Sequence, residues 1–162
     1  MNAVAKNRPA GLGPNARYYE DFDIGDEWET PRRTITDADI VGFAGLSGDF
    51  NPVHTDEEFA KTTAFEGRIL HGPGGFAIAT GLEFRLGIKE GTAVAMLGMT
   101  WDFKGPIKIG DTIHVYQRVA SMRETKNPTT GIVNFHVEIR NQRAEVVQAG
   151  EWKIMFFRRP QG

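Results

Sequence analysis

Residues 73–86 constrain the fold most, because their apolar side chains would occupy nearly every side of a helix. These side chains are Phe76, Ala77, Ile78, Ala79, Leu82, Phe84 and Leu86. Pro73 suits the first position of a helix, where its missing N–H is not needed. A helix that is apolar on nearly all sides has to be covered by other elements. The segment therefore predicts a central, buried helix.

The residues after Gly91 have the character of a run of β-strands, which we expect at 93–103, 112–123, 132–140 and 145–157. The third stretch alternates strictly, with Val133, Phe135, Val137 and Ile139 on one face and polar residues on the other. Gly, Asn, Asp and Pro residues separate the stretches, at 110–111, 127–131 and 141–142. A buried helix followed by an antiparallel sheet indicates the α+β class.

The chain before this helix divides into a tail and short elements. Residues 1–16 lack apolar periodicity and are expected to be disordered or loosely packed, which leaves 17–162 as one domain. A strand is expected at 27–35, at a sheet edge because Pro31 interrupts it. Thr36 and Asp39 resemble a capping box that opens a short amphipathic helix. Residues 56–62 can form another helical turn or two.

Asp49 and His54 lie on either side of an Asn51-Pro52 turn. On one continuous helix, residues five apart point roughly 140° away from each other and cannot share a substrate atom. Pro52 cannot donate a backbone hydrogen bond and biases Asn51 toward an extended conformation, so a helix should end at Gly48 and the chain should turn back. Asp49 and His54 can then face one point, as an acid/base pair does. Considered alone, Asp49 would more often be a helix-end or turn residue, and His54 a surface histidine or one with its hydrogen bonds satisfied.

Residues 43–60 around this turn resemble the signature of the MaoC-like (R)-specific enoyl-CoA hydratases, which have the hotdog fold. The similarity continues at 62–66, in Ile69-Leu70-His71-Gly72 and at 103–111, and it covers about residues 18–157. It implies that the sheet wraps around the central helix. It also implies reversible hydration of trans-2-enoyl-CoA to (R)-3-hydroxyacyl-CoA, with no cofactor beyond the CoA of the substrate.

Hydration of an enoyl thioester needs water at C3, a proton at C2 and stabilisation of negative charge on the thioester oxygen. Asp49 and His54 can hold and deprotonate the water and return a proton, since both groups act as general bases near neutral pH. By resemblance, the N–H of Gly72 binds the thioester oxygen, at the positive end of the central helix. We expect Asn51 to fix the turn and Thr80 to lie at the pocket. Arg68, Arg85, Lys104 and Lys108 are all candidates for the CoA diphosphate.

Other interpretations of these motifs are weaker. Asp49, His54 and His71 could supply a metal with two imidazoles and a carboxylate, but their spacing does not require it, and we expect no metal. His71 is more plausibly structural than catalytic. The glycines at 72, 74 and 75 do not form a phosphate loop, because no lysine with serine or threonine follows. Many relatives have bulkier residues after Gly72, so the Pro73-Gly74-Gly75 run suggests flexibility beside the oxyanion site.

Composition limits the remaining functions. A net charge of -2 and a pI near 6.1 give no general attraction to nucleic acid or an anionic membrane. The absence of cysteine excludes disulfides and a thiol nucleophile, and it permits a cytoplasmic location. No apolar run is long enough to span a membrane, so we expect a soluble protein that is not secreted.

We also expect at least a homodimer, with the pocket near the subunit interface, because a lone sheet would leave an edge open. His114 and His136 are expected at surface or interface positions. A hotdog acyl-CoA thioesterase and a non-catalytic acyl-CoA-binding subunit are the alternatives. The first does not need the Asp-Asn-Pro-His turn, and the second could lose either catalytic group.

Overall fold

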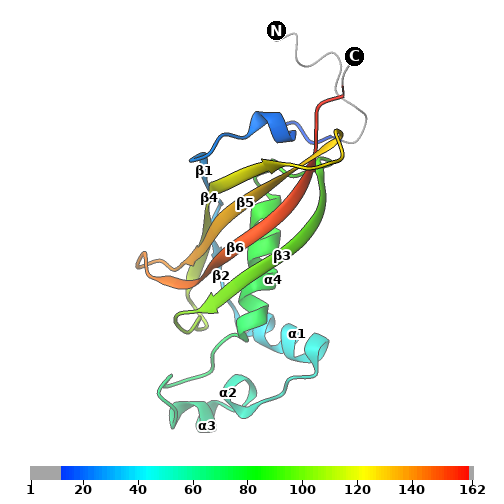
Figure 1. The fold of residues 1–162 in the computed structure, drawn as a ribbon. Helices are drawn as coiled ribbons and strands as arrows, with labels where there is room; N and C mark the ends of the chain where they lie inside the picture. Colours follow the sequence, from blue (N-terminus) through cyan, green and yellow to red (C-terminus); the bar gives the residue numbers. More distant parts are fainter. Residues whose placement is uncertain (1–11, 161–162) are drawn as a thin grey trace.

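The computed structural model describes residues 12–160 as a curved antiparallel sheet around one long helix (Figure 1). The 3-10 helix η2 is Tyr19–Asp21, and the α-helices are α1 (Asp37–Ser47), α2 (Pro52–Thr55), α3 (Glu57–Lys61) and α4 (Gly72–Phe84). The strands are β1 (Glu27–Glu29), β2 (Arg33–Thr34), β3 (Ala93–Phe103), β4 (Thr112–Glu124), β5 (Thr130–Arg140) and β6 (Val146–Phe157). The predicted α+β class is confirmed, and the four long strands lie within two residues of their predicted bounds.

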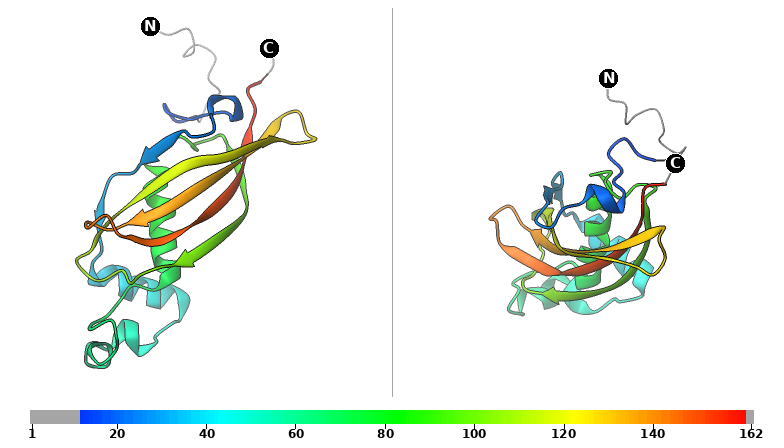
Figure 2. Two further views of the ribbon diagram at one scale, coloured as in Figure 1. Left: turned by 60° about the vertical axis from the view of Figure 1, so that its left-hand side comes forward. Right: turned by 45° about the horizontal axis from the view of Figure 1, so that its top comes forward.

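The strand order is β1-β4-β5-β6-β3, and β2 pairs with β4 beside β1. The long strands pair antiparallel with their neighbours, and the sheet curves around α4 (Figure 2). The alternation predicted for β5 is confirmed, since Val133, Phe135, Val137 and Ile139 all have 0% exposure. These side chains form the centre of the core between the sheet and α4.

The strand predicted at 27–35 is two short strands instead of one. Pro31 separates β1 from β2, and both pair with β4 at an edge of the sheet, where an interruption leaves few ladder bonds unmade. Thr30 bridges the gap, because its hydroxyl accepts the Val115 N–H at 2.9 Å while its own N–H donates to the Val115 carbonyl at 2.9 Å. The edge position was predicted correctly.

Only part of α4 is buried. Gly74, Gly75, Ala79, Leu82 and Glu83 are covered by the sheet and by α1, whereas Ala77, Thr80, Gly81 and Phe84 are exposed. Phe84 has 62% exposure. The predicted central helix is therefore confirmed, with the face toward the sheet buried, and nothing in residues 12–160 covers the opposite face.

The segment α1 to α3 lies beyond one end of the sheet, next to the start of α4 (Figure 1). The Asp39 carboxylate accepts the Thr36 backbone N–H at 2.8 Å, as the predicted cap requires. The helix ends at Gly48, whose φ of 76° is in the left-handed region that glycine adopts most easily. The predicted end of this helix is thus confirmed.

The predicted tail falls mostly outside the described residues. Of its last five residues, Gly13 and Ala16 are buried, and the Asn15 side chain donates to the Leu86 carbonyl at 3.3 Å. The Arg17 N–H donates to the Ile88 carbonyl at 3.0 Å. Residues 12–16 therefore pack against the loop that follows α4.

His114 is not at the surface. It has 5% exposure on β4, and burial lowers its pKa, with the Glu29 carboxylate acting in the opposite direction. Ile113, His114 and Val115 are all buried, and because successive side chains of a strand point to opposite faces, β4 is covered on both faces here. His136 is partly exposed and contacts Glu138 and Glu151, at 3.0 Å each. Within residues 12–160, none of the helices is both long and apolar enough to cross a membrane.

Candidate active site

The Asp-Asn-Pro-His turn folds as local chemistry requires. Asn51 has an extended backbone (φ −53°, ψ 133°), and its side chain accepts the Val53 N–H at 3.3 Å, which caps α2. Pro52 occupies the first position of that helix. One Asp49 carboxylate oxygen accepts the Asn51 N–H at 3.1 Å, and the carboxylate is exposed. Asn51 therefore fixes the turn, as expected.

His54 is oriented by the segment that leads into α4. Its Nδ1 lies 2.8 Å from the Ile69 carbonyl oxygen. Because a carbonyl can only accept, Nδ1 carries the proton, and the neutral ring keeps a lone pair on Nε2. The structure therefore leaves Nε2 able to take a proton from a water molecule.

His71 lies directly behind this pair. Its Nε2–H donates to the Asp49 carbonyl oxygen at 2.9 Å, and its ring stacks on His54 with centroids 3.7 Å apart and planes 25° apart. Phe43 contacts its other side at 5.0 Å between centroids. With 1% exposure, His71 joins the backbone of Asp49 to the ring of His54. This agrees with the predicted structural role of His71, which here holds Asp49 and His54 in position.

Asp49, His54 and His71 each offer an atom within 4.8 Å of the other two, as a metal site would require. The stacking argues against that use. A histidine coordinates an ion in the plane of its ring at about 2 Å. Two rings that stack nearly parallel at 3.7 Å cannot both hold one ion in their planes.

Close packing explains the glycines at the start of α4. A Cβ on Gly72 would lie 2.7 Å from the Phe103 ring, and one on Gly74 would lie 3.2 Å from Phe43 and from Leu70. A Cβ on Gly75 would lie 2.5 Å from Gln148 Nε2. Neighbouring side chains therefore fill the space that larger residues would take, and the added flexibility stays a prediction.

A cavity of about 480 Å³ adjoins the start of α4. Gly72 and Pro73 form one wall, and Phe65, Ile69, Phe103 and Ile107 contribute most of its apolar surface. Ile69 also holds His54 through its carbonyl, so the acid/base pair lies close to this cavity. Lys104 lines it as well.

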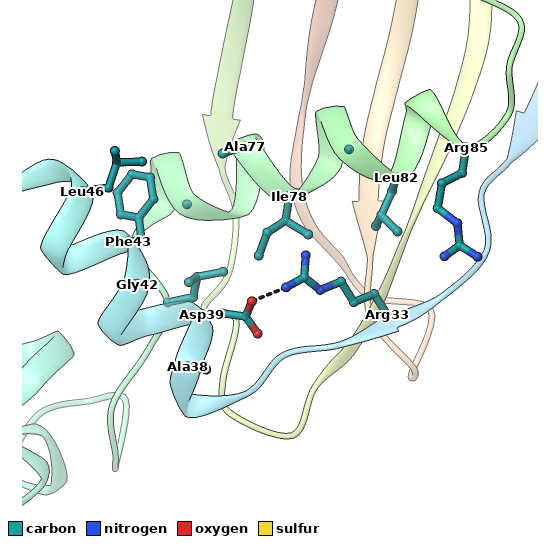
Figure 3. A pocket seen from close by; sticks show the side chains of 13 residues that line it. Arg33, Ala38, Asp39, Gly42, Phe43, Leu46, Ala77, Ile78, Leu82 and Arg85 are labelled. Atoms are coloured by element: carbon teal, nitrogen blue, oxygen red, sulfur yellow. Dashed lines mark hydrogen bonds and ion pairs between the residues drawn. The ribbon is translucent and has the colours of Figure 1, made fainter.

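A second groove of about 510 Å³ runs between α1 and α4 (Figure 3). Phe43 and Leu46 lie toward one end, and Arg33 and Arg85 toward the other, with Arg33 paired to Asp39. Of the predicted phosphate-binding cations, Arg85 lines this groove. Arg68 is instead bound to Asp37 at 2.8 Å and Glu57 at 3.2 Å.

Thr80 is not brought to the acid/base pair by the single chain. It lies on the exposed face of α4, and its hydroxyl donates to the Ala77 carbonyl at 2.7 Å. It is eight positions after Gly72, so a rise of about 1.5 Å per residue places it about 12 Å along the helix. Sequence reasoning also missed Trp101 and Gln148, which reach the start of α4 from distant parts of the chain and belong to no local motif. Phe43 and Phe103 lie within the stretches of family resemblance, but the sequence assigned them no role in the site.

A comparison with models of known protein families shows the family to which this chain belongs. Residues 21–140 match the model of the MaoC like domain. The chain belongs to the MaoC-like family. The match includes the Asp-Asn-Pro-His turn, the start of α4 and most of the sheet.

Three relatives show how much of this chain and of each related protein is similar. Protein MaoC of Klebsiella aerogenes is 36% identical over 144 residues, which is 88% of this chain and 39% of that protein. An (R)-specific enoyl-CoA hydratase of Aeromonas caviae is 41% identical over 108 residues, 66% of this chain and 78% of that protein. A 3-hydroxybutyryl-CoA dehydratase of Methylorubrum extorquens is matched over 65% of its length. The chain therefore spans less than two thirds of some of its relatives.

Solved structures agree with the MaoC-like assignment. A MaoC-like dehydratase from Rhodospirillum rubrum is 32% identical, with a TM-score of 0.82 over 90% of this chain and 99% of that chain. The (R)-hydratase from A. caviae has a TM-score of 0.70 at 31% identity, over 87% and 99% of the two chains. A Mycobacterium tuberculosis protein with a double hotdog fold, 17% identical, has a TM-score of 0.78 over 91% of this chain and 46% of that chain. The fold is the predicted hotdog fold.

Proposed function

We propose that this MaoC-like protein catalyses the reversible hydration of trans-2-enoyl-CoA to (R)-3-hydroxyacyl-CoA. The observation that carries the proposal is the approach of Asp49 and His54 to within 4.8 Å, beside the first turn of α4. Relatives at 36–41% identity named as hydratases and a dehydratase support the reaction class. The reaction needs no cofactor beyond the substrate's own CoA.

The proposed roles follow from the hydrogen bonds. His54 Nε2 and the Asp49 carboxylate hold a water molecule and take one of its protons, the water oxygen bonds to C3, and a proton from the pair reaches C2. The thioester oxygen accepts from the Gly72 N–H at the positive end of α4, which stabilises the enolate that forms. The cavity beside Gly72 holds the chain next to the thioester.

The test replaces each member of the pair. Asp49→Asn and His54→Asn should each lower kcat by about 10²-fold to 10⁴-fold, because a proton acceptor or donor is lost at the reacting water. The double variant should be barely worse than the worse single variant, since both groups act on one water. Hydration of crotonyl-, octenoyl- and branched enoyl-CoA is followed by loss of the conjugated thioester absorbance.

Matched controls separate chemistry from folding. Asp56→Asn keeps a side chain that caps α3 equally well, and His136→Asn changes a histidine on the sheet. Both should retain nearly full activity. A single variant that keeps more than about half of the wild-type kcat, where chemistry limits turnover, would contradict the role of that residue. Thioester hydrolysis without hydration would favour a thioesterase, and substrate binding without turnover a binding subunit.

A further inference from the structure

Gln148 on β6 holds the first turn of α4 from the side of the sheet. Its Nε2 donates to the Gly72 carbonyl oxygen at 3.1 Å, and its Oε1 accepts the Trp101 indole N–H at 2.9 Å. Both ends of the amide are thus bonded, and the residue has 2% exposure. The connection links β3, β6 and α4, which are far apart in the sequence.

Bonds on both sides of the Gly72 Cα fix the direction of its N–H. The His71 carbonyl accepts the Gly75 N–H at 3.1 Å, which holds the peptide between His71 and Gly72. In a trans peptide the N–H points opposite to the carbonyl, so the Gly72 N–H points out of the start of α4. Gln148 holds the next peptide through the Gly72 carbonyl. A glycine, which otherwise has the freest backbone, is therefore held in one conformation.

The packing shows that the space for this contact depends on glycine. A Cβ at position 75 would lie 2.5 Å from Gln148 Nε2, so a larger residue would displace the amide. The Phe103 ring lies against Gly72 from the same side of the helix, where a Cβ would be 2.7 Å from it. The unusual glycine run after His71 thus coincides with a glutamine that reaches the helix.

Gln117 shows that burial alone does not produce such bonds. It lies on β4 with 0% exposure, and neither its Oε1 nor its Nε2 has a hydrogen-bond partner within residues 12–160. Gln148 lies in the same sheet and has both bonds made. The difference is that its amide is placed between an indole donor and the carbonyl at the start of α4.

We propose that Gln148, itself oriented by Trp101, is a positioning residue that aims the Gly72 N–H at the thioester oxygen. The inference rests on the proposed function, in which that N–H stabilises the enolate. Removing one donor to an oxyanion costs about 10²-fold to 10³-fold in kcat, and misplacing it by about 1 Å has an effect of similar order. Loss of Gln148 should therefore slow the chemical step more than it weakens substrate binding.

The test uses Gln148→Met and Trp101→Phe in the full chain. Gln148→Met keeps the length of the side chain but loses both hydrogen bonds, and kcat should fall by about 10-fold to 100-fold with KM changed less than about threefold. Trp101→Phe keeps an aromatic ring and should give a smaller loss in the same direction. Gln117→Met is the matched control, a buried glutamine of the same sheet, and should leave kcat unchanged.

Two spectroscopic measurements distinguish positioning from general destabilisation. The infrared carbonyl stretch of bound ¹³C-labelled crotonyl-CoA should shift to higher frequency in Gln148→Met, because the carbonyl loses polarisation. His71-Gly72 is the only His-Gly pair in the sequence. Carbonyl-¹³C histidine combined with ¹⁵N glycine therefore isolates a single amide signal, which should move in Gln148→Met and stay in place in Gln117→Met.

Each outcome decides one point. A Gln148→Met protein with an unchanged carbonyl stretch and more than half of the wild-type kcat would overturn the inference and leave the hydratase function intact. An unmoved Gly72 amide would overturn it as well. Absence of hydration by the wild-type protein would instead refute the proposed function. If the Gly72 amide signal still moved in Gln148→Met, the structural contact between Gln148 and Gly72 would be supported even though the hydratase function was refuted.

Discussion

Single residues of the site have both a local and a shared task. Asp49 accepts the Asn51 N–H as an ordinary turn residue does, and the same turn brings its carboxylate near His54. His54 likewise donates to the Ile69 carbonyl through one nitrogen and keeps the other available. The structural and the catalytic interpretations of these residues are therefore compatible, because each side chain has two polar atoms and the fold occupies one.

Glu83 and Lys89 form an ion pair between the end of α4 and the loop that follows. Glu83 has 2% exposure, and the Lys89 ammonium lies 4.8 Å from the centre of the Phe135 ring and 5.0 Å from that of Trp152. Burial raises the pKa of Glu83 and lowers the pKa of Lys89, while each partner opposes the shift of the other. Neither charge is stable here without the other.

Breaking this pair should destabilise the protein strongly. Glu83→Gln leaves an unpaired buried ammonium and should cost about 3–5 kcal/mol, which lowers the melting temperature by about 10 °C. Glu83→Leu with Lys89→Met should restore most of the loss, since an apolar pair needs no charge partner. Glu58→Gln, in the exposed Glu58–Lys61 pair, is the control and should change little.

The loss of stability caused by Glu83→Gln should also depend on pH. Burial lowers the pKa of Lys89 and the Glu83 carboxylate raises it, so replacing Glu83 lowers this pKa further. The unfolded chain then binds the Lys89 proton more tightly than the folded variant does, and the stability of the variant rises more steeply than that of the wild type as the pH approaches the ordinary value of 10.5. The gap in melting temperature to the wild type should therefore narrow between about pH 7 and about pH 9. A gap that widens over this range, measured by scanning calorimetry, would contradict the assignment.

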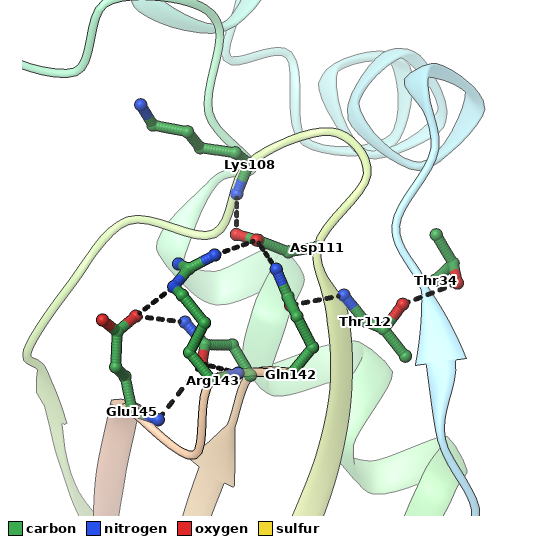
Figure 4. A network of polar contacts seen from close by, with 8 residues as sticks. Thr34, Lys108, Asp111, Thr112, Gln142, Arg143 and Glu145 are labelled. Carbon is green, nitrogen blue, oxygen red and sulfur yellow. Dashed lines mark hydrogen bonds and ion pairs between the residues drawn. The ribbon is translucent and has the colours of Figure 1, made fainter.

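At the level of elements, a buried carboxylate joins the loop before β4 to the loop between β5 and β6 (Figure 4). Asp111 has 6% exposure and accepts the Lys108 N–H and the Gln142 side-chain N–H, both at 2.8 Å. The loop before it contacts the segment that leads into His71, where the Leu70 N–H donates to the Ile107 carbonyl at 2.8 Å. The network therefore supports the active-site segment from outside.

Asp111→Ala should destabilise the protein and affect activity indirectly. The Lys108 N–H and the Gln142 side chain lose a charged, buried acceptor, which costs about 1–3 kcal/mol and lowers the melting temperature by about 5 °C. Hydrogen exchange at Leu70 should become faster. Asp23→Ala, at a turn near β1, is the control and should leave both quantities nearly unchanged. Equal melting temperatures of the two variants would show that the network is not stabilising.

The whole molecule has one apolar face that the single chain leaves open. β3 is an edge strand, and Val94, Met96, Leu97, Met99 and Phe103 on it are 41–59% exposed. The exposed face of α4 adds Phe84, with 62% exposure. Unpaired strand edges of this length pair readily with another chain. We therefore expect a second copy at β3, which would also cover Thr80 and close the site near α4.

The assembly can be tested by light scattering. The 18.0 kDa chain should elute as a species of at least two chains at micromolar concentration. Met99→Glu should shift it toward the monomer, because a charge at the edge opposes pairing. Ile24→Lys changes an exposed apolar residue at the turn before β1 and should leave the dimer intact. A wild-type monomer would refute this expectation.

The sequence by itself determined the features that depend on residues close together in the chain. The alternation of β5, the cap at Thr36, the helix end at Gly48 and the turn at Asn51-Pro52 all follow from side chains within a few positions, so they could be predicted. The family resemblance added the fold and the candidate pair. Tertiary structure alone decided that His71 stacks on His54 and that Gln148 reaches Gly72, because these contacts join residues 17 and 76 positions apart. Such contacts leave no periodic pattern, since they depend on how a sheet curves around a helix.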